Sequence, residues 1–127
     1  MPLNDKKLIF VDVETTGLDP ARHEIIEIGV LVVRQSDFSI LDSWEAKVAP
    51  AHIEAADTES LGIAGWSAEA WQDAIGQQKA MQTFAEKSRG CILVAYNVTF
   101  DWAFLEATAR RQGVELGMDY HRLDALS

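Results

Sequence analysis

Short runs of apolar residues follow one another along the first half of the chain, separated by turn-forming and polar residues. Each run has the length and the β-branched content of a strand. Because the links between them are short, the runs predict an antiparallel three-strand meander. The predicted strands are Lys7–Val13, Ile25–Arg34 and Ile40–Val48.

The second half of the chain changes to a helical spacing of apolar positions. Ser67 is a candidate N-cap for the first helix, and Gly113 follows the last one. This order of strands and helices predicts one mixed α/β domain. The predicted elements are a helix over Ala68–Ile75, a helix over Gln77–Ser88, a buried strand over Cys91–Ala95, a helix from Asn97 to about Arg111, and the start of a strand at Tyr120–Leu123.

Composition supports a folded domain and argues against membrane insertion or secretion. The chain has 127 residues, of which 48% are hydrophobic, enough for the core of one domain. Its longest apolar runs, Ile28–Val33 and Cys91–Tyr96, are far shorter than the roughly 18 residues that span a bilayer. No secretory signal is recognisable, and Cys91 has no second cysteine to pair with. We therefore expect a cytoplasmic protein with no membrane partner.

The net charge of the chain bears on which kind of nucleic-acid protein it could be. Twenty acidic residues face 11 basic ones, which gives a formal net charge of −9. Passive binding to a phosphate backbone relies on a surplus of Lys and Arg. A pair of bound divalent cations, however, would place a large positive charge at one point of an acidic surface. The charge therefore argues against a passive binder more than against a nuclease.

Two carboxylates interrupt the first predicted strand. Asp12 and Glu14 are two positions apart, so their side chains project from the same face of the strand. Carboxylates held so close repel each other unless a cation lies between them. A second interpretation places both at the solvent-exposed end of the strand, where acids are ordinary. An Asp-x-Glu pair alone does not decide between the two.

A second polar cluster lies where the later buried strand leads into a helix. Asn97 and Asp101 belong to this strand–helix junction, the position at which α/β sheets commonly hold their ligands. If this strand lies beside the first one, Asp101 converges with Asp12 and Glu14. A set of oxygen ligands suits Mg²⁺ or Mn²⁺, whereas zinc favours Cys and His.

These two segments resemble a known family. Phe10–Leu18, which reads FVDVETTGL, followed by IIEIG at Ile25–Gly29, is similar to the first motif of the DEDD superfamily of 3′–5′ exonucleases. Tyr96–Leu105, YNVTFDWAFL, is similar to the second motif, although Tyr96 stands where many relatives have His. The resemblance implies a ribonuclease H-like fold, two divalent cations (Mg²⁺ or Mn²⁺), and hydrolysis from the 3′ end of single-stranded DNA or RNA.

The resemblance also implies a role for each matching residue. Asp12 would bridge both cations, Glu14 would bind one of them, and Asp101 would hold the second. The terminal nucleotide would contact a group of residues from both motifs. These are the backbone around Thr15 and Thr16, the side chain of Leu18 near the base, and Asn97 and Phe100 as support.

The family's third motif, a fourth Asp with a His or Tyr, is not recognisable. Tyr120 and Asp124 have the Tyr-x-x-x-Asp spacing and would share a face if they lay on a helix. The competing interpretation, which we favour, makes this segment a strand that precedes the real motif. The sequence then predicts residues 1–127 to be one exonuclease domain without its C-terminal helix.

Several alternatives remain open from the sequence. The chain could instead be an exonuclease-like module that binds a nucleic acid or a protein without cutting, or another ribonuclease H-like nuclease that cuts internally. A polymerase or a second copy of the chain are possible partners. Elsewhere, His23 and His52 are expected on the surface, Cys91 in the core, and Trp66 is a candidate substrate contact.

Overall fold

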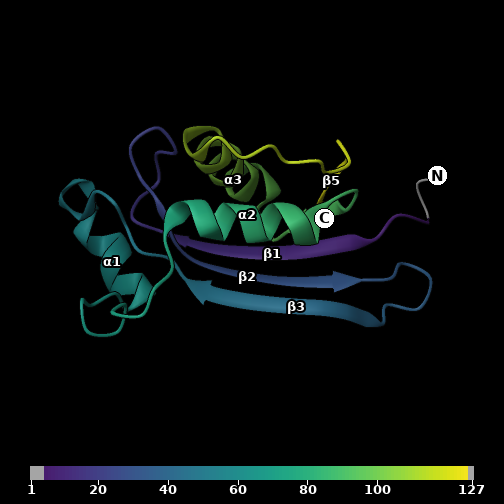
Figure 1. The fold of residues 1–127 in the computed structure, drawn as a ribbon, viewed down its shortest axis with the longest axis horizontal. Helices are drawn as coiled ribbons and strands as arrows, with labels where there is room; N and C mark the ends of the chain where they lie inside the picture. Colours follow the sequence, from purple (N-terminus) through teal and green to yellow (C-terminus); the bar gives the residue numbers. More distant parts are fainter. Residues whose placement is uncertain (1–4, 126–127) are drawn as a thin grey trace.

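A five-stranded mixed sheet forms the centre of the molecule (Figure 1). The computed structural model describes residues 5–125. The strand order is β3-β2-β1-β4-β5, in which β2 is antiparallel to both β1 and β3, whereas β4 runs parallel to β1 and β5 parallel to β4. The strands are β1 (Leu8–Thr15), β2 (Ile25–Val33), β3 (Ile40–Lys47), β4 (Ile92–Ala95) and β5 (Arg122–Asp124).

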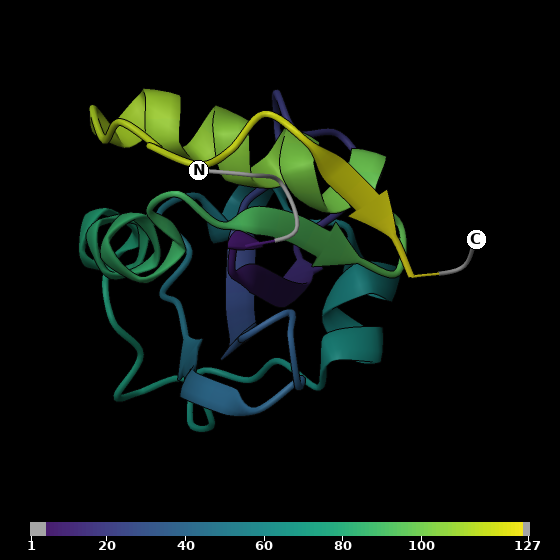
Figure 2. The same cartoon turned by 90° about the vertical axis from the view of Figure 1, so that its right-hand side faces the viewer.

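Helices α2 (Gln77–Ser88) and α3 (Val98–Gln112) lie together on one side of the sheet, as Figure 1 shows. The shorter α1 (Thr58–Ala64), which follows a 3-10 turn at Ile53–Ala55, lies beyond the end of the sheet at which β1 finishes. Figure 2 shows β4 and β5 running side by side next to α3. Within residues 5–125, no helix is long and apolar enough to cross a bilayer.

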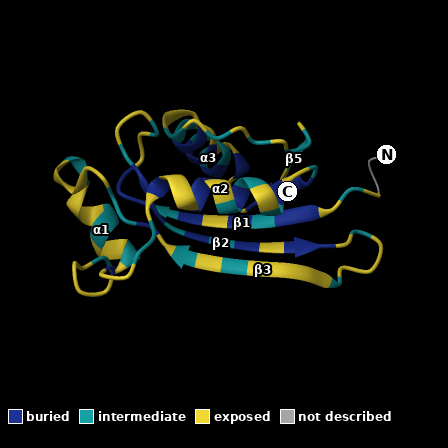
Figure 3. Cartoon of the chain, viewed as in Figure 1, coloured by how far each residue is buried: buried dark blue, intermediate teal, exposed yellow. Residues whose placement is uncertain are grey.

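The two faces of the sheet differ in cover. Strand β1 alternates, so that Ile9, Val11 and Val13 enter the large core beneath α2 and α3. Its other face belongs to a smaller apolar cluster made by Leu8, Val33, Ile92 and Val94, with Phe10 packed against it. Burial also differs between strands, as Figure 3 shows: β2 is largely buried, whereas the edge strand β3 is mostly exposed. Asp12 and Glu14 therefore project away from the main helical layer.

The structure confirms the predicted meander and the two longer predicted helices. The helix predicted over Ala68–Ile75 is wrong. Residues 68–73 form turns, and Ile75 makes an isolated parallel bridge to Val48. The indole N–H of Trp71 donates a buried 2.7 Å hydrogen bond to the carbonyl of Ile26. The Ile75 N–H donates to the Lys47 carbonyl at 3.0 Å. These contacts with β2 and β3 outweigh local helical propensity.

Helix α1 was not predicted, although its ends carry recognisable signals. Asp57 is its N-cap, and the side chain accepts a hydrogen bond from the Glu59 N–H. Gly65 ends it with a left-handed φ of 72°. None of its residues is buried, which explains why no clear apolar stripe marks the helix in the sequence.

Candidate active site

Strand β1 places two predicted site residues on the face opposite α2 and α3. Asp12 is exposed and Glu14 is half-buried. The antiparallel register sets Asp12 opposite Gly29, which has no side chain, and Glu14 opposite Glu27. Gly29 keeps the surface beside Asp12 open, since a Cβ added there would meet no atom within 4 Å.

The electrostatic surroundings of Glu14 are unfavourable to its charge. Burial raises the pKa of the Glu14 carboxyl above its ordinary value, and the nearby negative charges of Asp12 and Glu27 raise it further. Lys47 offsets only part of this charge, because its ammonium lies 3.6 Å from the Glu27 carboxylate and both groups are well exposed. The end of β1 is thus a concentration of negative charge.

Asp101 joins this acidic group from the first turn of α3. Only 6% of the residue is exposed, and this burial is the main reason why its pKa rises to about 6. The backbone N–H of Val13 donates a hydrogen bond that opposes the rise, while the charges of Asp12 and Glu14 add to it. The charges of two acids on β1 therefore reach a third acid on α3.

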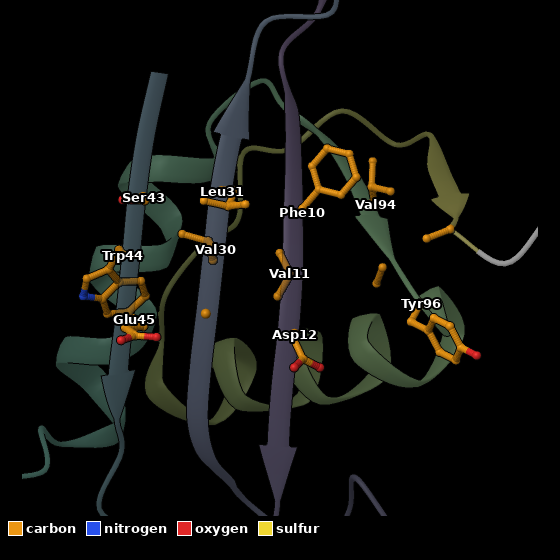
Figure 4. A pocket seen from close by; sticks show the side chains of 13 residues that line it. Phe10, Val11, Asp12, Val30, Leu31, Ser43, Trp44, Glu45, Val94 and Tyr96 are labelled. Atoms are coloured by element: carbon orange, nitrogen blue, oxygen red, sulfur yellow. The ribbon is translucent and has the colours of Figure 1, made fainter. Parts of the chain in front are cut away.

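A hollow of about 590 Å³ lies over the sheet next to Asp12. Its lining comes mostly from strands β1 to β4, together with Tyr96 and Ala125, and Figure 4 shows the Asp12 carboxylate at one side and the Tyr96 ring at another. Apolar side chains of Phe10, Leu31 and Val94 occupy the part farther from Asp12. The hollow combines two carboxylates, those of Asp12 and Glu45, with an apolar floor, an arrangement suited to a ligand with both charged and flat apolar parts.

The loop after β1 holds the predicted substrate contacts from the first motif. Thr15 and Thr16 are buried, with their hydroxyls inside the loop: Thr15 Oγ1 donates to the Gly17 carbonyl at 2.6 Å, and Thr16 Oγ1 accepts from the Glu24 N–H at 2.9 Å. Leu18 has 77% of its surface exposed. The loop is thus internally bonded while one apolar side chain faces solvent.

The two predicted substrate contacts of the second motif, Asn97 and Phe100, differ in how their side chains are held. Asn97 is exposed at the N-cap position of α3, but its side chain makes no capping hydrogen bond. Phe100 is half-buried, and its ring lies 4.9 Å from that of Phe104. Asn97 thus has a side chain that is not used by the helix, whereas Phe100 is fixed by aromatic packing.

The Tyr120–Asp124 segment does not form a helix. Arg122–Asp124 is the short strand β5, and the Tyr120 side chain is 81% exposed. Asp124 instead caps α3, because its Oδ1 accepts a hydrogen bond from the Val98 N–H at 2.8 Å. The interpretation of Tyr120 and Asp124 as a helical third motif is therefore wrong, and the competing interpretation as a strand agrees with the structure.

The donor set fits hard cations, although the side chains do not form a closed cluster. Among residues 5–125, no three Asp, Glu, His or Cys side chains are grouped so that they could already hold a metal ion. The oxygen-only chemistry of Asp12, Glu14 and Asp101 nevertheless matches Mg²⁺ and Mn²⁺. The raised pKa values of Glu14 and Asp101 are what an acidic site shows in the absence of compensating positive charge.

Two residues near the site were not singled out from the sequence, and the exposure expected for a third is wrong. Glu27 lies opposite Glu14, which only the strand register reveals. Glu24 is buried and accepts hydrogen bonds from the Ala51 and His52 N–H groups at 2.9 and 2.8 Å. His23, expected on the surface, is half-buried inside the loop after β1. His52 is exposed and Cys91 is buried, as expected.

Comparison with known proteins identifies the family. A family model described as "Exonuclease" (RNase_T) matches residues 9–122, which includes both motifs and all three acids. The chain belongs to this exonuclease family. The match confirms the resemblance to the DEDD exonucleases that the two motifs indicated.

Curated relatives of this exonuclease-family chain are much longer proteins. It is 32% identical over 109 residues to the DNA polymerase III PolC-type of Caldanaerobacter subterraneus subsp. tengcongensis, covering 85% of this chain and 7% of the relative. It is 30% identical over 114 residues to the corresponding Thermotoga petrophila protein, covering 90% of this chain and 8% of the relative. The family domain thus corresponds to a small part of these proteins.

Solved structures confirm the predicted fold class. E. coli Exonuclease I in complex with a dT13 oligonucleotide has a TM-score of 0.79 at 16% identity, over 94% of this chain and 28% of that one. An ExoI/SSB-Ct complex has a TM-score of 0.81 at 17% identity, with the same coverage. The likeness confirms the ribonuclease H-like arrangement of a mixed sheet with flanking helices.

Proposed function

We propose that this chain is a metal-dependent 3′–5′ exonuclease domain that hydrolyses phosphodiester bonds at the 3′ end of DNA or RNA. The observation that carries the proposal is the electrostatic coupling of three carboxylates. Burial raises the pKa of Asp101, and the charges of Asp12 and Glu14, which come from a different element, raise it further. Carboxylates held close together repel one another, and a bound cation would offset this repulsion.

Asp12, Glu14 and Asp101 would hold two divalent cations, Mg²⁺ or Mn²⁺. When bound, such a pair acidifies an attacking water and stabilises the leaving 3′ oxygen of an in-line displacement. The chain's own contribution is to orient the carboxylates. The Val13 N–H directs the buried carboxyl of Asp101 by a hydrogen bond, and β1 fixes Asp12 and Glu14 on one face.

The residues around the acids would bind the terminal nucleotide. The bonded Thr15–Thr16 segment offers a rigid backbone surface, and the exposed Leu18 would pack against the terminal base. Asn97 has a side chain that does not cap α3, so its amide can serve the substrate. Phe100 would support the same pocket from its packing on Phe104.

A single-stranded 3′ end is the substrate class that the comparisons favour. One structural neighbour, with the same fold, is described as a complex with a dT13 oligonucleotide. The curated relatives are named as polymerases of the PolC type. We therefore propose single-stranded DNA or RNA as substrate and a polymerase as a partner, while a homodimer remains a prediction of the sequence.

A second candidate function is binding of a 3′ end without cleavage. Two observations favour it: among residues 5–125, no group of three potential metal ligands is assembled, and Tyr120 and Asp124 do not form the helical third motif. In that case the hollow beside Asp12 would hold the nucleotide, but hydrolysis would not follow.

The two candidates are separated by one experiment. A 5′-labelled single strand is incubated with Mn²⁺ and either the native protein or Asp12→Ala, and a second strand carries a blocked 3′ end. We expect the native protein to shorten the free strand by single nucleotides, and both the blocked strand and the Asp12→Ala reaction to stay intact. Binding without shortening would favour the second candidate, and cleavage by Asp12→Ala would contradict the first.

A further inference from the structure

The loop between β1 and β2 is closed at its neck by backbone and side-chain bonds. The Thr16 N–H donates to the Glu24 carbonyl at 2.8 Å, and the Glu24 N–H donates to Thr16 Oγ1 at 2.9 Å. Both residues are buried. The neck therefore joins the end of β1 directly to the start of β2, and the intervening residues form a compact projection next to Glu14.

The His23 ring fills the inside of this projection. Its Nδ1 accepts a 3.0 Å hydrogen bond from the Asp19 N–H, and the His23 N–H donates to the Asp19 carbonyl at 2.7 Å. A Cβ added to Gly17 would lie 2.4 Å from the ring, so only glycine leaves room for His23 there. The ring thus lies close against Gly17 and accepts the Asp19 N–H, and Leu18 between these two residues is 77% exposed.

Helix α3 holds the same projection from outside. Arg111, in the last turn, donates from Nη1 to the Pro20 carbonyl at 2.8 Å and from Nη2 to the His23 carbonyl at 3.4 Å. Asp101 lies in the first turn of this helix. A single rigid element thus fixes both the third acid and the loop that carries Leu18.

We propose that His23 is a positioning residue that presents Leu18 to the 3′-terminal base, with Arg111 as the anchor of the loop. The inference rests on the proposed function, in which Leu18 contacts that base. A lone exposed leucine is ordinary on a protein surface. Leu18 lies between two residues that contact the half-buried His23 ring, so its backbone is already ordered, and a ligand binding against it loses little conformational entropy in the loop.

A pair of His23 variants separates the ring's volume from its acceptor. His23→Phe keeps an aromatic ring but removes the Nδ1 acceptor, whereas His23→Asn keeps a polar acceptor near the Nδ1 position. Affinity is measured by fluorescence anisotropy with a 5′-labelled single strand in Mn²⁺, whose last linkage is a phosphorothioate that slows cleavage. We expect His23→Phe to weaken binding about tenfold and His23→Asn to restore most of the loss.

Coupling to Leu18 distinguishes positioning from a general structural role. If His23 acts through Leu18, then Leu18→Ala weakens binding by a similar factor, and adding His23→Phe to it weakens binding no further. The Mn²⁺ affinity of each variant should equal that of the native protein. Additive losses, or native affinity in His23→Phe, would overturn the proposal.

Arg111→Met provides a second variant should His23→Phe fail to fold. It removes the bonds to Pro20 and His23 and should also weaken binding of the strand. Arg110→Met is its matched control, since Arg110 is exposed and its ion pair reaches only Glu106, at 3.8 Å. Equal affinities of the two variants would contradict the role of Arg111. If the native protein itself does not bind the strand, the proposed function fails first and this inference falls with it.

Discussion

The Val13 N–H donates a hydrogen bond to the carboxyl of Asp101, so the central strand orients an acid of the neighbouring helix. Val13 lies between the other two acids of the site, Asp12 and Glu14, and its own side chain is buried beneath the helices. One residue of β1 therefore contributes to the core through its side chain and to the site through its backbone. This link explains how three carboxylates come under mutual electrostatic influence in so small a fold.

Asp101→Asn should stabilise the cation-free protein at neutral pH. The folded-state pKa of about 6 exceeds the ordinary value of 3.8, so the folded protein binds more protons than the unfolded chain between these values. The free energy of unfolding therefore falls as the pH rises from 3.8 through the folded-state pKa of about 6, because the buried carboxyl becomes charged. Asn removes the buried charge but retains an oxygen for the Val13 N–H, and we expect a gain of about 2 kcal/mol at pH 7.

Urea unfolding in EDTA at about pH 7 and about pH 4 measures this effect. At the lower pH, Asp101 is largely protonated in the folded protein, so the variant and the native protein should differ little. Equal free energies of unfolding at neutral pH would show that Asp101 carries no burial penalty.

Glu27→Gln should lower the pKa of Glu14. The charge of Glu27 is one cause of the upward shift, after burial and the charge of Asp12. Removing it leaves the other two causes, so the Glu14 pKa should fall while staying above its ordinary value. Carboxyl NMR titration measures the change, and Glu54→Gln, on the exposed 3-10 turn, is the control. An unchanged Glu14 titration in Glu27→Gln would contradict the coupling.

Trp71→Phe should destabilise the fold more than Trp66→Phe. The indole N–H of Trp71 donates a buried 2.7 Å bond to the Ile26 carbonyl, whereas the buried indole nitrogen of Trp66 has no protein partner among residues 5–125. The Ile26 carbonyl also accepts from the Val48 N–H at 2.8 Å, so losing the Trp71 bond removes one of two bonds to it, which costs on the order of 1 kcal/mol. Chemical denaturation of both variants gives the comparison. Equal losses would mean that the Trp71 bond contributes nothing specific.

Asp124→Ala should weaken α3 by removing the acceptor for the Val98 N–H. We expect a loss of about 1 kcal/mol, typical of a lost helix cap, and a smaller loss in Asp124→Asn, which keeps an oxygen. Asn97→Ala is the matched control, because Asn97 is the N-cap residue yet makes no side-chain capping bond. Thermal unfolding compares the three variants. A larger loss in Asn97→Ala than in Asp124→Ala would reverse this assignment.

Local pattern was sufficient to predict the strands of the meander and the two longer helices, whereas the roles of the three acids come from the family resemblance and stay a prediction. Alternation along β1 places Asp12 and Glu14 on one face, and the strand–helix junction places Asp101. Contacts between distant segments could not be predicted. The helix expected at Ala68–Ile75 is replaced by turns that Trp71 ties to Ile26. Glu27 joins the acidic group only through the register of β1 and β2.

Thermal unfolding with and without Mn²⁺ tests most directly the central claim that Asp12, Glu14 and Asp101 together bind divalent cations. Native protein at saturating Mn²⁺ should melt roughly 5–15 °C higher, because a ligand at 100 times its Kd adds about 2.7 kcal/mol. Asp12→Asn should lose most of this increase, whereas the exposed control Asp73→Asn should keep it. An unchanged melting temperature in the native protein, or an equal increase in Asp12→Asn, would contradict the claim.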